Sequence, residues 1–404
     1  MMPPALAIPR QGPRPLALHL ALAQTAWASS LAVLPHLKSG LPGWNPTDPR
    51  LAQTAAALLE HDARGIEALE REIDRRHAQL LTGIARYRSH PYRRALPDPP
   101  VLWQEGSTRL LDYRPDGHPA ALFVPSLVNR GYILDLSARH SLLRWLADQG
   151  LRPLLVDWGR PDEAARDFTL TDYVAGRLDR ALDVALHFAE GALPVVGYCM
   201  GGLLAVALAQ RRREAITGIA LLATPWDFHA EAPDHARRGA DVAAMLGPLL
   251  DSWGELPVDV LQTLFAGIDP LSTVAKFMAF ADGPGERAEA FVALEDWLND
   301  GVPLAGPVAR ECLAGWYGEN TPARGRWRIA QRPVMPGAVR RPSLHMIPAR
   351  DRIVPPASAR ALAAAMPGAE VVEPPLGHIG MMVGGGARRD VWQPLARWLS
   401  ARAR

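Results

Sequence analysis

The sequence contains few of the residues that mark disulfide-rich, metal-binding or nucleic-acid-binding proteins. Its 404 residues include only two cysteines, Cys199 and Cys312, which lie far apart. This usage excludes a disulfide framework and is typical of the reducing cytoplasm. No histidines and cysteines occur at metal-ligand spacing, so we expect no metal site. Lys and Arg exceed Asp and Glu by only two, which indicates neither nucleic acid nor a charged membrane surface as a partner.

Charge is absent from one long stretch near the N-terminus. Residues 15–37 include no Asp, Glu, Lys or Arg. Polar residues dilute this run, and its leucines and alanines recur at helical spacing, which favours an amphipathic helix over a membrane-spanning one. A signal peptide is the alternative, because Arg10, Arg14 and the Ala-Trp-Ala of residues 26–28 loosely resemble its parts.

A second helical pattern occupies residues 51–88. One stripe is apolar, from Leu51, Ala55 and Leu58 to Ile84 and Tyr87, and charged residues crowd the other faces. Such a helix buries its stripe either on its own domain or on a partner chain. His-Pro at residues 90–91 ends the pattern, and the prolines of residues 97–100 indicate a linker. We therefore predict an N-terminal helical region over residues 1–100.

The remaining residues, 101–404, predict one α/β domain. Short apolar strands alternate with helices, and this pattern is typical of a mostly parallel sheet with helices on both faces. The expected strands are residues 108–113, 119–125, 152–158, 194–198, 216–223, 342–348 and 369–372. The expected helices are residues 138–149, 172–190, 200–210, 356–366 and 390–401.

An insertion of mixed helical and irregular character separates the two halves of this domain, at about residues 227–341. Its position predicts a cap over the active site. It carries several arginines that either meet the phosphates of a ligand or form a solvated basic face, and the second interpretation is favoured. These arginines are Arg324, Arg326, Arg328, Arg332, Arg340 and Arg341.

The most informative stretch is Pro-Val-Val-Gly-Tyr-Cys-Met-Gly-Gly-Leu-Leu, residues 194–204. An apolar strand, a turn with small residues on both sides of Cys199 and a helical pattern together predict a nucleophile elbow. Gly197 and Gly201 would clear space for the strained turn, and Gly202 would let the helix approach the sheet. Cys199 would then lie at a helix N-terminus, which favours its thiolate. The alternative is a buried cysteine in an ordinary strand-turn-helix unit.

A cysteine nucleophile needs a base, and the base needs a group that orients it. In folds with such an elbow the chain order is nucleophile, acid and histidine. Asp351 follows the strand expected at residues 342–348, and His378 follows the strand expected at residues 369–372. Both are therefore expected at the sheet edge to which the elbow points.

The reaction of a cysteine with an acyl group also needs donors for the developing oxyanion. The backbone N–H of Met200, the residue after the nucleophile, is one candidate. The other is expected in the loop of residues 126–129, and we favour the N–H of Val128.

These motifs resemble the polyhydroxyalkanoate synthases, a family of the α/β-hydrolase fold, and especially its shorter kind, which works with a separate partner subunit. The resemblance extends from about Tyr87 to the end of the chain. It rests on residues 197–202 (Gly-Tyr-Cys-Met-Gly-Gly), 124–136, 155–159, 224–229, 316–320 and 377–380.

By this resemblance Cys199 carries the growing acyl chain, His378 is the base, and Asp351 activates the substrate hydroxyl or steadies the histidine. Two features depart from the family pattern. Arg352 follows the aspartate where the family usually has histidine, and the N-terminal helical region is larger than expected for the shorter kind.

The sequence thus predicts an acyltransferase that polymerises 3-hydroxyacyl-CoA into polyester and releases CoA, with no cofactor besides the CoA thioester that is its substrate. A hydrolase of thioesters or intracellular polyester on the same fold is one alternative, and a granule-associated binding protein with little catalysis is another. Expected partners are a second copy of the chain or a partner subunit, and a granule surface in the cytoplasm. The preferred acyl-chain length is not predicted.

Overall fold

The structure is a computed structural model, and it describes residues 9–38, 53, 57, 62–231, 233–283 and 286–402. The chain forms two compact units. The helical unit comprises Met1–Arg93 and Gln262–Asn299, and the sheet unit comprises Arg94–Leu261 and Asp300–Arg404. Residues 262–299, which the sequence analysis assigned to the cap insertion, thus group with the N-terminal helices.

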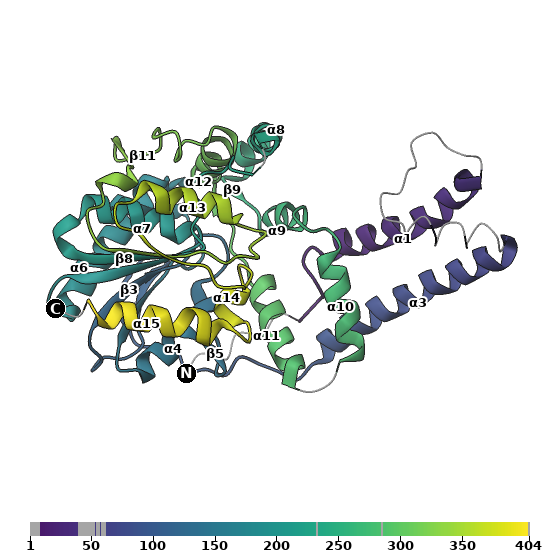
Figure 1. Ribbon diagram of the computed structural model, residues 1–404, viewed down its shortest axis with the longest axis horizontal. Coiled ribbons are helices and arrows are strands. Elements are labelled where there is room, and N and C mark those ends of the chain that lie inside the picture. The colour runs from purple at the N-terminus through teal and green to yellow at the C-terminus, as the bar shows by residue number, and fades with distance from the viewer. Residues whose placement is uncertain are drawn as a thin grey trace. The chain divides into compact units, whose positions relative to one another are not determined.

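The sheet unit is built on a sheet of eight strands in the order β1-β2-β6-β3-β7-β8-β13-β14 (Figure 1). All neighbours from β6 to β14 pair in parallel, and β1 and β2 form an antiparallel edge. The strands are β1 (Val101–Glu105), β2 (Thr108–Asp112), β3 (Ala120–Val124), β6 (Arg152–Asp157), β7 (Leu193–Tyr198), β8 (Ile216–Leu222), β13 (Ser343–Met346) and β14 (Glu370–Val372). The expected parallel sheet is confirmed, but strand β1 was not predicted.

Helices cover both faces of this sheet, as expected. Figure 1 shows α6, α7 and α13 on one face and α4 and α15 on the other. Every residue of β3 and β7 is buried, because central parallel strands covered on both faces carry apolar side chains in both directions. The α-helices outside the insertion are α4 (Leu142–Asp148), α5 (Leu170–Asp172), α6 (Asp179–Ala189), α7 (Met200–Arg211), α13 (Pro356–Ala365), α14 (Gly380–Val383) and α15 (Gln393–Ser400).

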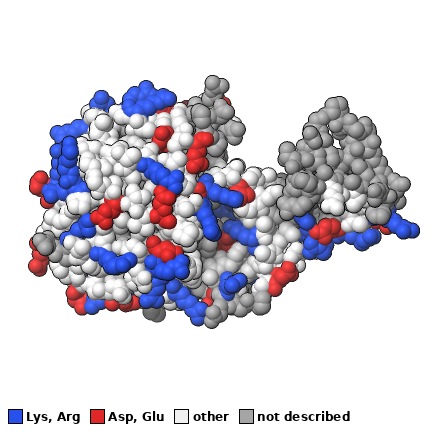
Figure 2. Space-filling view, in the orientation of Figure 1, with Lys and Arg blue, Asp and Glu red and all other residues white. Residues whose placement is uncertain are grey.

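The insertion is mainly helical. Within the sheet unit its elements are α8 (Pro233–Trp253), β9 (Glu255–Leu256), β10 (Leu304–Ala305), α12 (Gly306–Arg310), the π-helical turn η5 (Glu311–Gly318), β11 (Arg328–Ile329) and β12 (Arg332–Pro333). Helix α9 (Val258–Ala266) runs across the boundary between the units. On the face shown in Figure 2, basic and acidic side chains are interspersed among uncharged ones.

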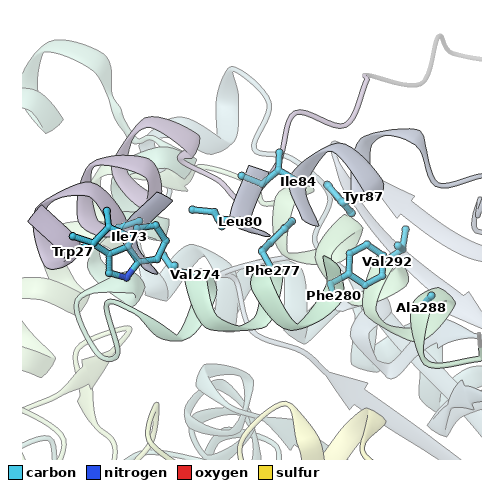
Figure 3. Packing of buried hydrophobic residues seen from close by; sticks show 11 residues of the cluster. Trp27, Ile73, Leu80, Ile84, Tyr87, Val274, Phe277, Phe280, Ala288 and Val292 are labelled. Carbon is cyan, nitrogen blue, oxygen red and sulfur yellow. The ribbon is translucent and has the colours of Figure 1, made fainter. Parts of the chain in front are cut away.

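The helical unit packs α1 (Leu16–Lys38), α3 (Asp62–Ser89), α10 (Ser272–Asp282) and α11 (Glu286–Asn299) around one apolar core. Figure 3 shows this core, with Ile73, Leu80, Ile84 and Tyr87 of α3 facing Phe277 and its neighbours. The α3 stripe is thus covered by residues of the same chain from Ile73 to Tyr87, whereas Ile66, nearer the start of the helix, is 39% exposed. Leu51, Ala55 and Leu58, the first residues of the predicted stripe, lie outside the described residues.

Helix α1 contributes one face to this core. Ala23 and Trp27 are buried, and the Trp27 ring meets His77 edge-on with centroids 4.7 Å apart. By length and composition alone, residues 16–33 are apolar enough to cross a membrane. One face of the helix packs against α3 and α10, as an amphipathic helix would, but only 17% of the residues in this window are buried.

Candidate active site

The elbow predicted around Cys199 is present between β7 and α7. Cys199 has φ 55° and ψ −129°, a strained conformation for a residue with a side chain. Its N–H donates to the carbonyl of Leu222 at 2.9 Å, and its carbonyl accepts from the N–H of Gly202 at 2.9 Å. These bonds hold the turn, and the side chain stays partly exposed. Cys199 is therefore not sealed in the core.

All three glycines of the elbow are required by close contacts. A Cβ atom on Gly197 would lie 2.4 Å from the Cα of Gly202, and one on Gly201 would lie 2.1 Å from the carbonyl oxygen of Val124. On Gly202 it would lie 1.9 Å from Oγ1 of Thr224. Real side chains do not approach so closely, so the expected close approach of helix and sheet is confirmed.

Asp351 lies in the loop after β13, as predicted, and its carboxylate is buried. One oxygen, Oδ1, accepts the N–H groups of Ile353 and Val354, each at 2.9 Å. The other, Oδ2, lies 2.7 Å from Nδ1 of His378. Backbone bonds between this loop and the loop after β14 continue the parallel pairing beyond the strands, and they bring the two side chains together.

His378 lies in the loop after β14 and is 6% exposed. The Tyr198 hydroxyl donates to its carbonyl at 3.2 Å, which ties this loop to the strand of the elbow. Burial alone lowers the pKa of the imidazole, but the charges of Cys199 and Asp351, with hydrogen bonds to both, raise it to about 10. Because Nδ1 faces Asp351, Nε2 is the nitrogen left for the sulfur. The structure thus joins His378 to Asp351 by a hydrogen bond, and the charge of Cys199 acts on the pKa of the same imidazole.

This arrangement has the elements of nucleophilic catalysis. A buried carboxylate hydrogen-bonds the imidazole and fixes its tautomer and orientation, and the charge of the cysteine at the elbow acts on the pKa of that imidazole. The side chains packed around Cys199 are apolar, among them Ile347, Ile353 and Val354. Such surroundings exclude water from one side of the sulfur.

The loop predicted to complete an oxyanion hole follows β3, as expected, but its polar groups are already engaged. The N–H of Val128 donates to Oγ of Ser126 at 3.0 Å. Val128 can serve as the second donor only if an acyl oxygen replaces this hydroxyl. Met200 begins α7 directly after Cys199, as the elbow requires.

Two segments of the insertion are joined beside the elbow. Asn320 donates from Nδ2 to Oδ1 of Asp227 at 2.7 Å, and its Oδ1 accepts the N–H of Phe228 at 3.1 Å. The Phe228 ring stacks on Trp316 with centroids 5.8 Å apart and meets Tyr317 edge-on at 4.9 Å. Residues 224–229 and 316–320, two motifs of the sequence resemblance, therefore form one aromatic clasp.

Tyr317 is a candidate site residue that the sequence analysis did not single out. It is 45% exposed, yet the protein around its phenol raises the pKa of this group, and the charges of Cys199 and Cys312 raise it further. The phenol is thus electrostatically coupled to both thiols. Its neighbour Cys312 is buried, and burial raises the pKa of that thiol.

The arginines of the insertion do not converge on the elbow. Arg324, Arg326, Arg328, Arg332 and Arg340 are exposed and Arg341 is half-buried. Arg326 pairs with Glu319 at 3.4 Å, and Arg341 pairs with Glu214 at 3.3 Å. They form the solvated basic face that the sequence analysis favoured. Within the described ranges, no group of three or more His, Cys, Asp or Glu side chains is arranged to hold a metal ion.

Comparisons with known proteins agree with this geometry. The family model of the alpha/beta hydrolase fold matches residues 171–385, which include Cys199, Asp351 and His378. The poly(3-hydroxyalkanoate) polymerase subunit PhaC of Synechocystis sp. is 32% identical over 294 residues, 70% of this chain and 77% of that protein.

Two further relatives carry the same name. The PhaC subunit of Allochromatium vinosum is 29% identical over 75% of this chain and 88% of that protein. That of Haloferax mediterranei is 28% identical over 75% of this chain, and the match spans 64% of its own length. With its α/β-hydrolase sheet, its cysteine elbow and these relatives, the chain belongs to the poly(3-hydroxyalkanoate) polymerase family.

Proposed function

We propose that the protein is an acyltransferase that polymerises 3-hydroxyacyl-CoA into polyhydroxyalkanoate through an acyl-Cys199 intermediate and releases CoA. The proposal rests on the hydrogen bond between His378 and the buried Asp351 carboxylate, and on the strained elbow that presents Cys199, whose charge acts on the pKa of the imidazole. The membership of the family of poly(3-hydroxyalkanoate) polymerases supports it.

Before the first step, His378 holds the thiol proton as an imidazolium, as its raised pKa implies, and in that step the Cys199 thiolate attacks the carbonyl carbon of the CoA thioester. The N–H of Met200 and the loop that contains Val128 stabilise the oxyanion. The carbon–sulfur bond to CoA then breaks, His378 returns the proton to the departing thiolate, and the acyl group stays on Cys199. One thioester replaces another in this exchange, so the acyl group stays activated.

In the second step, His378 takes the proton of a hydroxyl group on another 3-hydroxyacyl unit, and the resulting oxygen attacks the acyl-Cys199 carbonyl. The ester bond forms, the bond to sulfur breaks, and the proton passes to the thiolate. Water in the place of the hydroxyl would give a free acid. The aromatic clasp, with Phe228 and Trp316, is the part of the cap that we assign to water exclusion.

A hydrolase of thioesters or polyester on the same fold is the second candidate, because the same three side chains serve hydrolysis equally well. What favours transfer is the sulfur nucleophile, whose acyl derivative passes readily to an alcohol. The granule-associated binding protein is the third candidate, and the buried hydrogen bond between His378 and Asp351 is an argument against it.

The proposal includes the surroundings of the enzyme. We place it in the cytoplasm at the surface of polyester granules, as a homodimer or with a partner subunit, with neither a nucleic acid partner nor a cofactor besides the CoA substrate. The helical unit is the part of the chain that we assign to these contacts.

The test is incubation of the purified protein with 3-hydroxybutyryl-CoA, followed by identification of the products. Free CoA together with polymer supports the synthase, and free CoA together with free acid supports the hydrolase. Release of no CoA by either the wild type or Cys199→Ala supports the binding protein. Cys312→Ala is the matched control, because the other cysteine lies outside the proposed chemistry and its removal should leave CoA release intact.

A further inference from the structure

A pocket outside the line of Cys199, His378 and Asp351 lies along β2 and β6 of the sheet unit. Its volume is about 190 Å³, and its floor includes Leu111 and Leu155. Sites that enclose a whole drug-sized ligand measure about 300–1,000 Å³. This pocket therefore suits one end of a longer molecule.

The polar side chains of the pocket balance in charge. Three arginines and three aspartates line it, together with two tyrosines. Arg109 pairs with Asp157, and Arg130 lies 3.0 Å from Asp300. Because the charges of the lining balance, it does not favour an anionic ligand over a neutral one. It does offer guanidinium donors and carboxylate acceptors side by side. A neutral planar ring with both donors and acceptors along its edge matches that lining.

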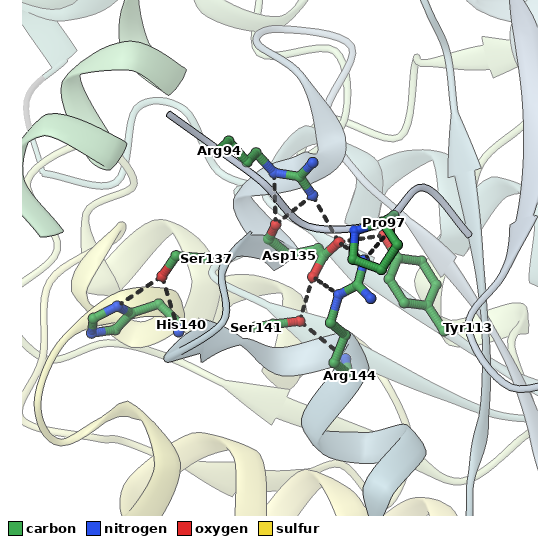
Figure 4. A network of polar contacts seen from close by, with 8 residues as sticks. All are labelled: Arg94, Pro97, Tyr113, Asp135, Ser137, His140, Ser141 and Arg144. Atoms are coloured by element: carbon green, nitrogen blue, oxygen red, sulfur yellow. Dashed lines mark hydrogen bonds and ion pairs between the residues drawn. The ribbon is translucent and has the colours of Figure 1, made fainter. Parts of the chain in front are cut away.

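Side chains that line the pocket are held in place by hydrogen bonds to a buried carboxylate outside it. Asp135 is fully buried, and its Oδ2 accepts from Arg94 at 2.8 Å and from the Tyr113 hydroxyl at 3.2 Å (Figure 4). Its Oδ1 accepts from Ser141 and Arg144. The Arg94 guanidinium also lies over the Tyr132 ring, 5.3 Å from its centroid. These contacts fix two pocket side chains before any ligand binds, which reduces the entropy lost on binding.

The pocket is close along the chain to the acyl site. Arg130 and Tyr132 follow Val128, the candidate oxyanion residue, by two and four positions. Four residues of extended chain reach at most about 14 Å. The pantetheine arm of coenzyme A, a chain of about thirteen bonds between sulfur and phosphorus, compares with about four residues of extended polypeptide. Gly131, between Arg130 and Tyr132, packs against Pro125, and Pro125 in turn packs against Gly201 of the elbow. A molecule as long as coenzyme A can therefore extend from the pocket toward Cys199.

We propose that this pocket is the adenine subsite for the CoA thioester, with Arg109 and Asp157 hydrogen-bonding the edge of the base and the ring packing on the apolar floor. The inference rests on the proposed function, because it names where the nucleotide part of the CoA substrate binds. Adenine carries an amino donor and ring-nitrogen acceptors, which are the groups that a guanidinium and a carboxylate together recognise.

The test compares two acyl donors that share the reacting end. These are 3-hydroxybutyryl-CoA and the 3-hydroxybutyryl thioester of pantetheine, which lacks the nucleotide. In the variant R109M/D157N both members of the ion pair are replaced, so no charge is left unpartnered. We expect KM for the CoA thioester to rise about tenfold or more, with kcat and the KM for the pantetheine thioester unchanged. The control is R341M/E214Q, which removes another ion pair and should change neither KM.

If R109M/D157N changed KM equally for both acyl donors, or for neither, the proposed adenine subsite would be wrong. A second readout needs no turnover: calorimetry of adenosine with the wild type and with R109M/D157N. Adenosine should bind the wild type and lose at least about tenfold in affinity in the variant. Equal binding to both overturns the subsite even when turnover is normal. If the wild type releases thiol from neither donor, the proposed function fails, and the calorimetry still decides whether the pocket takes adenosine.

Discussion

Acidification should weaken the fold through one buried histidine far from the proposed chemistry. His345 lies in β13, is 2% exposed, and its Nε2 has no hydrogen-bond partner among the described residues. Burial lowers its pKa from 6.5 to about 4. The unfolded chain therefore takes up a proton on this histidine below pH 6.5, whereas the folded chain resists it until about pH 4. Stability is lost as the pH falls through this window.

The size of the effect follows from that shift. A difference of about 2.5 pKa units corresponds to about 3.4 kcal/mol at most, since one unit is worth about 1.4 kcal/mol. Between pH 7.5 and pH 5 the linkage relation gives a loss of about 2 kcal/mol from His345 alone. His378, whose pKa is raised, contributes with the opposite sign, because its stabilisation is complete at low pH and is lost as the pH rises toward 10.

The assay is urea unfolding of the wild type and of His345→Leu at pH 7.5 and at pH 5. Comparing the two proteins at both pH values cancels His378 and every other shared group. The wild type should lose about 2 kcal/mol more than the variant on acidification. His187→Leu, at an exposed histidine of α6, should behave as the wild type. Equal losses in the wild type and His345→Leu, within about 0.5 kcal/mol, would refute the argument.

Three further predictions concern the proposed site. Asp351→Asn should lower kcat for CoA release about 10³-fold or more, because the imidazole loses the group that sets its tautomer; a loss below tenfold in steady-state assays would contradict that role. Gly202→Ala should lower the free energy of unfolding by about 1–3 kcal/mol, because the new methyl group meets a side chain 1.9 Å away, whereas Gly385→Ala, with open space around it, should be neutral. Asn320→Asp places a carboxylate against Asp227 and should loosen the aromatic clasp, so the products should shift from polymer toward free acid. An unchanged ratio of polymer to free acid would contradict the role of the clasp in excluding water.

The elbow and the positions of Asp351 and His378 could be predicted from sequence because they depend on local features. A strained turn needs glycines at fixed offsets, and parallel strands deliver the loops that follow them to one edge of the sheet. Chain order and strand assignment were therefore sufficient to bring together side chains nearly 180 residues apart in the sequence. The hydrogen bond between His378 and Asp351 agrees with one of the two roles that the sequence analysis left open for the aspartate.

Other features depend on contacts that a linear pattern does not encode. The Val128 N–H is occupied by the hydroxyl of Ser126, which only three-dimensional geometry shows. Tyr317 lies within residues 316–320, one of the motifs of the resemblance, but nothing in the sequence indicates that its phenol is coupled to the Cys199 thiol. The edge strand β1 is only partly buried, so it lacks the continuous apolar run that revealed β3 and β7. The apolar residues of α10 mark a buried helix, but they do not say that its partner is α3 rather than the sheet.

The central claim, an acyl group carried on Cys199, can be measured directly. The protein is mixed with 3-hydroxybutyryl-CoA, quenched within one turnover and digested, and the peptides are identified by mass spectrometry. The account predicts one 3-hydroxybutyryl group on the peptide that contains Cys199, formed far more slowly in His378→Gln. CoA release without any acyl group on Cys199, or with the acyl group on another residue, would contradict it.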